Sequence, residues 1–523
     1  TWLAIGASIF ASNIGSEHLI GLAGAGASSG MAMAHWEIQG WMILILGWVF
    51  VPFYSRSMVY TMPEFLERRY NPQSRTILSV ISLVSYVLTK VAVTVYAGGL
   101  VFQQVFGIKE LWGIDFFWIA AIGLVVLTAL YTIFGGMKSV LYTSVLQTPI
   151  LLLGSLIILV LGFKELGGWD EMMRVCGAVT VNDYGDTMTN LIRSNDDANF
   201  PWLGALIGSA IIGFWYWCTD QFIVQRVLSG KNEKEARRGT IFGAYLKLLP
   251  VFLFLIPGMI AFALHQKYIG AGGEGFLPML ANGTANADAA FPTLVAKLLP
   301  AGVKGLVVCG ILAALMSSLA SLFNSSAMLF TIDFYKRFRP ETPEKKLVGI
   351  GQIATVVIVI LGILWIPIMR SVGDVLYTYL QDVQSVLAPG IAAAFLLGIC
   401  WKRTSAQGGM WGLIAGMVIG LTRLGAKVYY SNAGEVADST FKYLFYDMNW
   451  LFFCGWMFLF CIIVVIVVSL ATEAPTAEKI QGLVFGTATK EQKAATRASW
   501  DHWDIIHTAI ILAITAAFYW YFW

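Results

Sequence analysis

Recurrent long apolar runs are the feature of this sequence that most constrains its fold. A helix needs about 20 mainly apolar residues to cross a bilayer, and about thirteen segments of the chain meet that requirement. Because 58% of the residues are hydrophobic and only 12% are charged, we predict an all-α, multi-pass membrane protein rather than a soluble domain. The predicted spans are 2–24, 34–55, 74–106, 112–134, 139–163, 201–228, 238–266, 300–334, 347–369, 374–400, 406–427, 449–472 and 502–523.

The basic residues lie mostly in alternate connections between these spans. Cytoplasmic connections are enriched in Lys and Arg, so this asymmetry predicts that the first span enters the cell membrane from the cytoplasm and that the last one ends outside. The net charge of +3 is too small to indicate a nucleic-acid partner. The sequence shows no nucleophile and base pair, no metal-ligand spacing and no phosphate-binding loop, so we do not expect an enzyme.

Four polar residues interrupt the first predicted span at membrane depth. Residues 12–16 are poor helix-interior residues, and Gly15 can adopt dihedral angles that other residues cannot. We therefore predict that this helix is broken in mid-membrane, which frees backbone carbonyls of the kind that transporters use to coordinate sodium. A packing face of small residues is the alternative, but it does not account for the polar residues, which are Asn13, Ser16, Glu17 and His18.

The eighth predicted span could supply the remaining oxygens of such an ion site. Ser317 and Ser318 point about 100° apart on a helix, and Ala314 lies one turn earlier on the same side as Ser317. One carbonyl and two hydroxyls from this span, together with two carbonyls from the broken first span, would give five oxygens, a set that suits a hard monovalent cation. Taken alone, a serine-rich span indicates a packing surface, and only the pairing with the broken helix favours an ion.

Other spans carry polar and aromatic residues that suit a hydroxylated solute. A lysine inside a span is costly unless it is paired or reaches the surface, and Lys247 lies too deep to reach the surface easily. With Gln381, Glu37, Asn13 and His18 it would form a dense set of donors and acceptors around neutral hydroxyls. Hydrogen-bonding groups beside flat aromatic faces match a neutral pyranose, which has hydroxyls at its rim and C–H faces. For the aromatic residues, an interfacial belt or bundle packing is the alternative.

With these residues assembled, the chain resembles the sodium/glucose cotransporter branch of the sodium:solute symporter family over nearly its whole length. The resemblance implies an inverted repeat of five plus five helices, of the LeuT type, followed by three further helices and preceded by one before Thr1. The expected parts are a first repeat at 1–163, an extracellular loop at 164–200, a second repeat at 201–403 and the last helices at 404–523. The most specific matching motifs are GASIFASNIGS (6–16), GWVFVP (47–52), TMPEFL (61–66), WYWCTDQ (215–221), YLKLLP (245–250) and LAALMSSLASLFNS (312–325).

Carried over residue by residue, the resemblance implies a sugar pocket, two gates and a sodium site. The outer gate falls on Leu22 and Tyr377, and the inner side is closed by Tyr216. The pocket falls on Asn13, His18, Glu37, Tyr216, Trp217, Lys247 and Gln381. The sodium site falls on Ala11, Ile14, Ala314, Ser317 and Ser318.

These residues predict a sodium-coupled symporter that imports a neutral hexose, such as glucose or galactose, by alternating access. Ser144 and Ala320 occupy positions where relatives with a second sodium have ligands, so we expect one Na⁺ per sugar. Gly213 stands where relatives offer Asn or Thr to the substrate, so one hydrogen bond is expected to be missing. The alternatives are the same carrier with myo-inositol, another polyol or an organic acid as solute, or a sensor of sugar and sodium.

Overall fold

The structure is a computed structural model of residues 1–523. It describes the backbone of the chain apart from residues 58–61, 281, 373–374 and 434–436. Side chains are described apart from those and residues 131–148, 221, 225, 324 and 370–372.

The first half of the chain forms short helical pieces that join into longer rods. Several pieces are π-helical, among them η1, η3 and η4, and one short hairpin, β1 with β2, interrupts the helices. In chain order the elements are α1 (Trp2–Asn13), η1 (Glu17–Leu22), α2 (Ala23–Ser29), η2 (Gly30–Met33), α3 (Ala34–Glu37), α4 (Gly40–Ile45), η3 (Leu46–Phe50), α5 (Val51–Ser57), α6 (Met62–Arg69), α7 (Pro72–Ser85), η4 (Tyr86–Val91), α8 (Ala92–Phe106), β1 (Glu110–Leu111), β2 (Ile114–Asp115), α9 (Phe116–Leu166) and α10 (Trp169–Gly177).

The second half is also helical and ends in long, regular helices. Its elements are α11 (Trp202–Gly213), η5 (Phe214–Thr219), α12 (Gln221–Leu228), α13 (Glu233–Leu246), η6 (Val251–Leu255), α14 (Ile256–Gly270), η7 (Ala287–Ala289), α15 (Ala290–Leu298), α16 (Ala301–Met328), η8 (Leu329–Tyr335), α17 (Lys336–Phe338), α18 (Glu344–Val372), α19 (Leu376–Cys400), α20 (Ala406–Asn432), α21 (Thr440–Lys442), η9 (Tyr443–Asp447), α22 (Trp450–Ala471), α23 (Ala477–Ile480), α24 (Lys490–Ala498) and α25 (His502–Tyr521).

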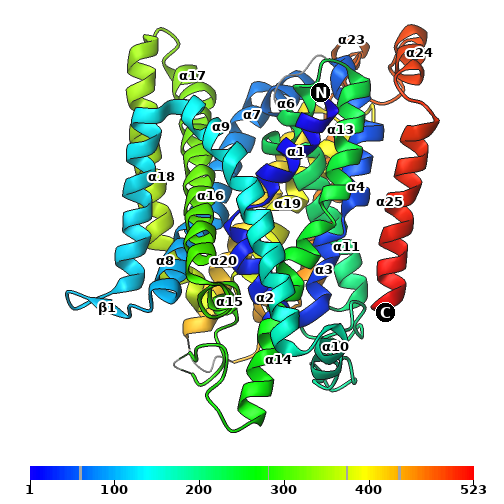
Figure 1. The fold of residues 1–523 in the computed structure, drawn as a ribbon. Helices are drawn as coiled ribbons and strands as arrows, with labels where there is room; N and C mark the ends of the chain where they lie inside the picture. Colours follow the sequence, from blue (N-terminus) through cyan, green and yellow to red (C-terminus); the bar gives the residue numbers. More distant parts are fainter. Residues whose placement is uncertain (58–61, 281, 373–374, 434–436) are drawn as a thin grey trace.

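Most of the long helices run between two ends of one bundle (Figure 1). The amino terminus lies at one end with α6, α17, α23 and α24, which belong to the connections richest in Lys and Arg. We call this the basic end. The carboxyl terminus, the β1–β2 hairpin and α10 lie at the opposite end, which we call the far end.

All thirteen predicted spans are helical, although two of them differ from the prediction in their limits. Among the described residues, eleven helical runs are long and apolar enough to cross a membrane. The count is lower by two. The first span is divided, so that its second part continues into the run Glu17–Ser57, and the fourth is represented only by the shorter apolar segment Phe116–Leu130. The prediction of two separate helices at 112–134 and 139–163 is wrong. α9 is one helical segment that continues through Gly135 and Gly136 and reverses its direction at the basic end (Figure 1).

The first helix is broken where the sequence predicted it. α1 ends at Asn13, and Ile14 has extended backbone with φ −81° and ψ 108°. The N–H of Ile14 bonds the carbonyl of Phe10, but in the described chain no backbone hydrogen bond is donated by Gly15 or Ser16. The carbonyl of Ala11 therefore lacks its usual helical partner, and an irregular turn lies between α1 and η1.

A second break, which we did not predict, divides the sixth span. η5 ends at Thr219, and Asp220 is extended, with φ −77° and ψ 127°. The Asp220 side chain then accepts the N–H of Phe222 over 3.0 Å and so caps the start of α12. The first helix of each predicted repeat is thus interrupted, and a pair of interrupted spans in corresponding positions is the best pointer to a transporter's binding site.

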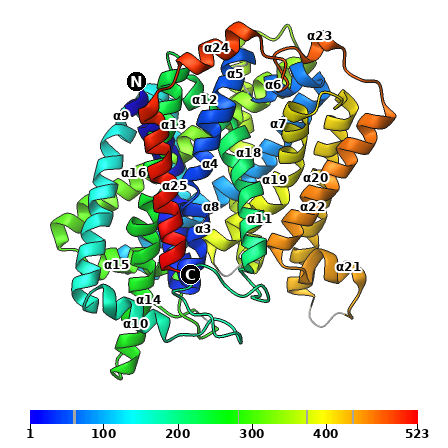
Figure 2. The ribbon, with the colours of Figure 1, turned by 90° about the vertical axis from the view of Figure 1, so that its right-hand side faces the viewer.

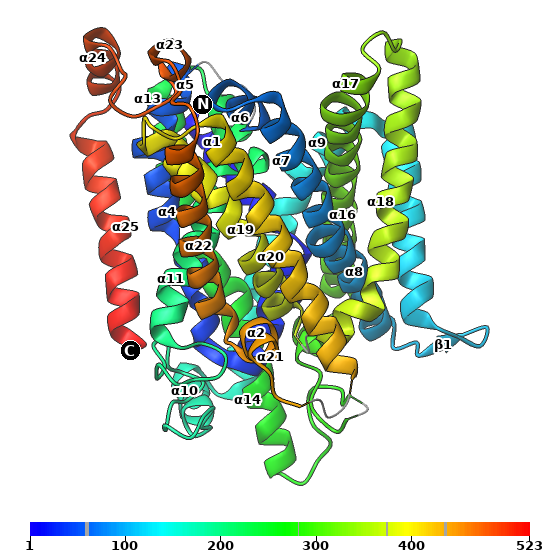
Figure 3. The same ribbon diagram turned by 180° about the vertical axis from the view of Figure 1, so that it is seen from behind.

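The helices that carry the polar residues lie in the middle of the bundle. In the most apolar part of Leu376–Cys400, 83% of residues are buried, and in Glu233–Gly270 the share is 78%. In His502–Tyr521 it is 17%, and Figure 2 shows α25 standing at the front of the bundle. Figure 3 shows α20 and α22 at the front of another side of the bundle, where both pack on α19. Polar groups on the inner helices therefore face protein rather than lipid.

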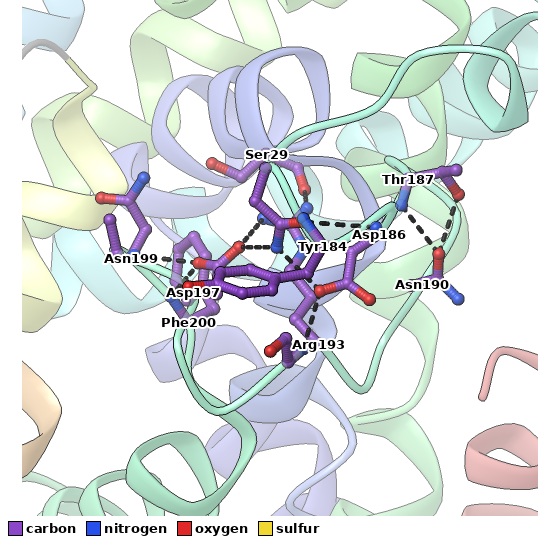
Figure 4. Close-up of polar contacts among 12 residues, drawn as sticks. Ser29, Tyr184, Asp186, Thr187, Asn190, Arg193, Asp197, Asn199 and Phe200 are labelled. Atoms are coloured by element: carbon purple, nitrogen blue, oxygen red, sulfur yellow. Dashed lines mark hydrogen bonds and ion pairs between the residues drawn. The ribbon is translucent and has the colours of Figure 1, made fainter.

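The connection between α10 and α11 forms a hydrogen-bonded cap at the far end (Figure 4). Asn182 Nδ2 donates to Asp186 Oδ2 and to Asp197 Oδ2, each over 2.7 Å. Arg193 donates to the carbonyl of Ser29, the last residue of α2, and lies 3.9 Å from Asp197 Oδ2. Burial lowers the pKa of Arg193, and the Asp197 carboxylate opposes that shift. The cap is thus attached to the end of α2 that lies at the far end of the bundle.

Candidate functional site

A small cavity of about 50 Å³ lies between the two broken helices. Six of the seven residues predicted for the sugar pocket line it, and Tyr377 lines it as well. The seventh, Glu37, is fully buried and contacts the lining residue Lys247. The lining residues are Asn13, Glu17, His18, Trp36, Gln39, Ile212, Gly213, Tyr216, Trp217, Lys247, Tyr377, Leu380, Gln381 and Gln384.

Local irregularities of the helices place several of these side chains. His18 belongs to η1 and Tyr216 and Trp217 belong to η5, and both elements are π-helical, a form that is frequent at functional sites. Lys247 is the C-cap of α13. Pro250, three residues later, has no N–H to give to the carbonyl of Leu246, so the helix ends there and resumes as η6.

A buried ion pair organises one wall of the cavity. Lys247 Nζ donates to Glu37 Oε2 over 2.6 Å and to Asn13 Oδ1 over 3.2 Å. The other carboxylate oxygen of Glu37 accepts the Tyr377 hydroxyl over 2.6 Å. Asn13 in turn donates to the hydroxyl of Tyr216 over 3.2 Å. One hydrogen-bonded chain therefore joins the first break, α3, α13, η5 and α19.

Several polar atoms around the cavity have no partner within the described part of the chain. They are both ring nitrogens of His18, Nε1 of Trp36 and Oε1 of Gln381. His18 Nε2 lies 3.4 Å from Glu37 Oε2, which is within ion-pair distance but without the geometry of a hydrogen bond. Because a buried polar group is normally hydrogen-bonded, donors and acceptors gathered at one cavity indicate a polar ligand.

Sequence analysis missed part of the lining, notably Glu17, Trp36, Gln39 and Gln384. Glu17 was noticed as polar but was given no role. Gln39 could have been found from its position only two residues after Glu37, had the interruption between α3 and α4 been predicted. Trp36 stacks on Trp450 at 5.5 Å and looks like ordinary packing in the sequence.

The far side of the cavity is closed. An added Cβ on Gly21 would lie 3.1 Å from Cβ of Tyr377, so η1 and the start of α19 are in close contact, and Leu22 is fully buried. Asp288 of η7 accepts the N–H of Leu376 with both carboxylate oxygens, at 3.1 Å each. Leu22 is therefore buried beside the contact between η1 and Tyr377, and Asp288, which the sequence did not indicate, bonds the start of α19; that Leu22 and Tyr377 form an outer gate stays a prediction.

A second, larger cavity of about 190 Å³ lies on the basic side of the first. It begins among Met62, Pro63 and Arg75 of α6 and α7, and we call it the vestibule. Tyr216 and Gln384 line both cavities and therefore separate them. Tyr216 thus lies between the cavity and the vestibule, and its role as an inner closure stays a prediction.

The five predicted sodium ligands lie on two separate elements. Ala11 and Ile14 flank the first break, where the carbonyl of Ala11 is not used by the helix. Ala314, Ser317 and Ser318 lie on α16, which packs mainly on α9 and α18, whereas α1 packs mainly on α12 and α13. The site stays a prediction. The Ser144 side chain lies outside the described side chains, and Ala320 is fully buried without a side-chain oxygen.

Comparison with solved structures defines the class of protein. The substrate-bound outward-open structure of a Na⁺-coupled sialic acid symporter matches 91% of this chain and 91% of its own, with a TM-score of 0.66 at 22% identity. The fold is therefore the LeuT-type arrangement of a multi-pass helical transporter.

Comparison of sequences gives the family. The model of the sodium:solute symporter family matches residues 1–416. Human sodium/myo-inositol cotransporter 2 is 36% identical over 93% of this chain and 73% of its own length. The sodium/myo-inositol cotransporter of the dog, Canis lupus familiaris, is 37% identical over 93% of this chain and 70% of its own.

The chain belongs to the sodium:solute symporter family, as the motifs indicated. It is a sodium-coupled symporter of the membrane, and Na⁺ is its co-transported ion. The expectation that it is not an enzyme agrees with this family of transporters.

Proposed function

We propose that the protein imports a neutral, hydroxyl-rich six-membered ring together with sodium, and that myo-inositol is the first solute to test. Relatives that are 36–37% identical over 93% of the chain are myo-inositol cotransporters, which favours this solute over the hexose expected from the motifs. Glucose and galactose remain the second candidates, since they present a similar ring of hydroxyls.

The observation that carries this proposal is the set of unpartnered polar atoms around the cavity. Trp36 and Gln381 offer a donor and an acceptor that no described group hydrogen-bonds. His18, which also lacks a hydrogen bond from the described groups, has the Glu37 carboxylate 3.4 Å away. Tyr216 and Trp217 lie perpendicular at 4.9 Å and provide flat faces beside them. Alternating hydroxyls and C–H faces on one ring would satisfy both kinds of group.

The charges of the cavity favour a neutral solute over an organic acid. Lys247 is the only Lys or Arg among the lining residues that the structure describes, and Glu37 already pairs with it at 2.6 Å. Glu17 adds a further carboxylate to the lining. An anionic solute would therefore meet no free lysine or arginine and would lose its hydration without compensation.

Coupling follows from the shared first break. Sodium bound by the carbonyls of Ala11 and Ile14 would hold the turn that also positions Asn13 and His18 for the solute. By linkage, each ligand then raises the affinity for the other by the same factor. We place the basic end in the cytoplasm, so that the vestibule is the route of release past Tyr216.

The expected stoichiometry is one Na⁺ per solute. Moving one charge across 100 mV supplies about 2.3 kcal/mol, or roughly 50-fold accumulation of solute. Uptake should therefore be electrogenic, with close to one positive charge moved per solute.

The deciding experiment is uptake of labelled myo-inositol, glucose and galactose into proteoliposomes, with and without an inward sodium gradient. We expect sodium-driven accumulation with myo-inositol as the preferred solute. Accumulation of none of the three would overturn the proposal. Counterflow of labelled against unlabelled solute distinguishes a carrier from a sensor, because a sensor does not exchange its ligand.

A further inference from the structure

Gln39 occupies the non-helical step between α3 and α4, and its side chain crosses to α11. Its Nε2 donates to the backbone carbonyl of Ser209 over 2.8 Å, and the residue is only 2% exposed. Ile212 and Gly213, one turn further along α11, line the same cavity as Gln39. The carboxamide is therefore fixed by its nitrogen end to the helix that forms the cavity wall.

The oxygen end of this carboxamide is open to the cavity. Oε1 accepts no hydrogen bond from any residue that the structure describes. The buried polar atoms without a partner do not include Oε1, although it has none among the described residues. Oε1 therefore keeps some accessible surface, through which a small molecule in the cavity can reach it. An amide oxygen carries two lone pairs, and Gln39 thus presents a positioned acceptor.

Gly213 leaves the space that this carboxamide fills. A Cβ added to Gly213 would lie 2.6 Å from Oε1 and 3.1 Å from Cδ of Gln39. The first distance is shorter than real Cβ contacts allow, so any larger residue at 213 would displace the amide. The cavity wall beside Gly213 therefore still has a hydrogen-bonding group, which is the carboxamide of Gln39.

We propose that Gln39 is a specificity-determining residue, whose carboxamide oxygen accepts a hydrogen bond from one hydroxyl of the solute. This inference rests on the proposed function, since it requires a hydroxylated solute in the cavity. A site built to bond a substrate hydroxyl discriminates strongly against the analogue that lacks it, because the acceptor is then buried without a partner.

The test is sodium-driven uptake by wild type and Gln39→Ala, using the better transported of myo-inositol and glucose and its series of mono-deoxy analogues. We expect Gln39→Ala to raise KM about tenfold, the effect of one hydrogen bond. In wild type each deoxy analogue should have a higher KM than the parent solute. In the variant one analogue should no longer differ from the parent, while the other analogues keep their higher KM. Sodium binding without solute, followed by tryptophan fluorescence, should stay unchanged.

Gly213→Ala is the second variant and keeps Gln39 itself. The atom displaced by the new methyl group is the end of a flexible side chain, so the protein should fold while the amide moves. We expect a rise in KM and weaker discrimination against the same analogue. The matched control is Gly123→Ala on α9, where an added Cβ meets nothing within 4 Å and KM should not change.

The two proposals fail in different ways. If wild type accumulates neither solute, the proposed function is overturned. If wild type accumulates solute but both variants keep its KM and every penalty for a missing hydroxyl, Gln39 has no role in specificity and the proposed function stands.

Discussion

Removing one partner of the Glu37 and Lys247 ion pair should destabilise the protein measurably. Lys247→Met keeps an unbranched side chain of similar length, but it leaves the Glu37 carboxylate without its cation. That carboxylate is 0% exposed. Breaking a buried pair in this way costs about 3–5 kcal/mol. At ~2.1 cal/mol/K per residue the entropy of unfolding is roughly 1.1 kcal/mol/K for this chain, so Tm should fall by about 3–5 °C.

The double variant Glu37→Gln/Lys247→Met distinguishes the cost of an unpaired buried carboxylate from the cost of losing the lysine side chain. It buries no charge, and the carboxamide introduced at position 37 could still accept the Tyr377 hydroxyl, so we expect most of the lost Tm to return. The assay is thermal unfolding in detergent, followed by the loss of the monodisperse protein. Lys90→Met is the control, because no acidic group of the described residues lies within ion-pair distance of Lys90. A Lys247→Met Tm within about 1 °C of wild type, or a double variant as unstable as the sum of the singles, would refute the reasoning.

Three further substitutions test the sodium site, the cavity and the outer gate. Ser318→Ala should abolish the sodium dependence of uptake in a folded protein, and unchanged dependence would remove Ser318 from the ion site. Gln381→Ala should raise KM for the solute about tenfold while sodium binding without solute is kept, and the reverse pattern would mean that the two sites are exchanged. Asp288→Ala removes the acceptor of the Leu376 N–H and should loosen the predicted outer gate. An impermeant maleimide added outside should then label a cysteine at position 22 (Leu22→Cys) at least about tenfold faster than it does with Asp288 present. Equal rates would exclude Asp288 from the gate.

The first break was predictable because its cause is local. Asn13, Gly15 and their serine neighbours disfavour a helix whatever surrounds them, and the structure ends α1 at Asn13. The second break at Asp220 was not predicted. There most of the surrounding residues are aromatic or apolar, although Thr219 and Gln221 beside Asp220 are polar. The interruption depends on the Asp220 side chain capping the following helix, which a periodicity argument does not reveal.

The part of the cavity that sequence reasoning missed depends on similar irregularities. On a regular helix Glu37 and Gln39 would point about 200° apart, and only one of them could face the interior. Ile38 and Gln39 lie between α3 and α4 instead, and this step turns both polar side chains inward. Asp288 was missed for another reason: its partners, Leu376 and Tyr96, are 88 and 192 residues away along the chain.

The partition formed by Tyr216 and Gln384 has a pharmacological consequence. The vestibule, at about 190 Å³, is nearly four times as large as the solute cavity of about 50 Å³, and it begins at the end that we assign to the cytoplasm. A molecule that fills the vestibule would contact Tyr216 and Gln384 from the vestibule side without occupying the solute cavity. Such an inhibitor would arrest the carrier from inside the cell, and raising the external solute concentration would not relieve the block.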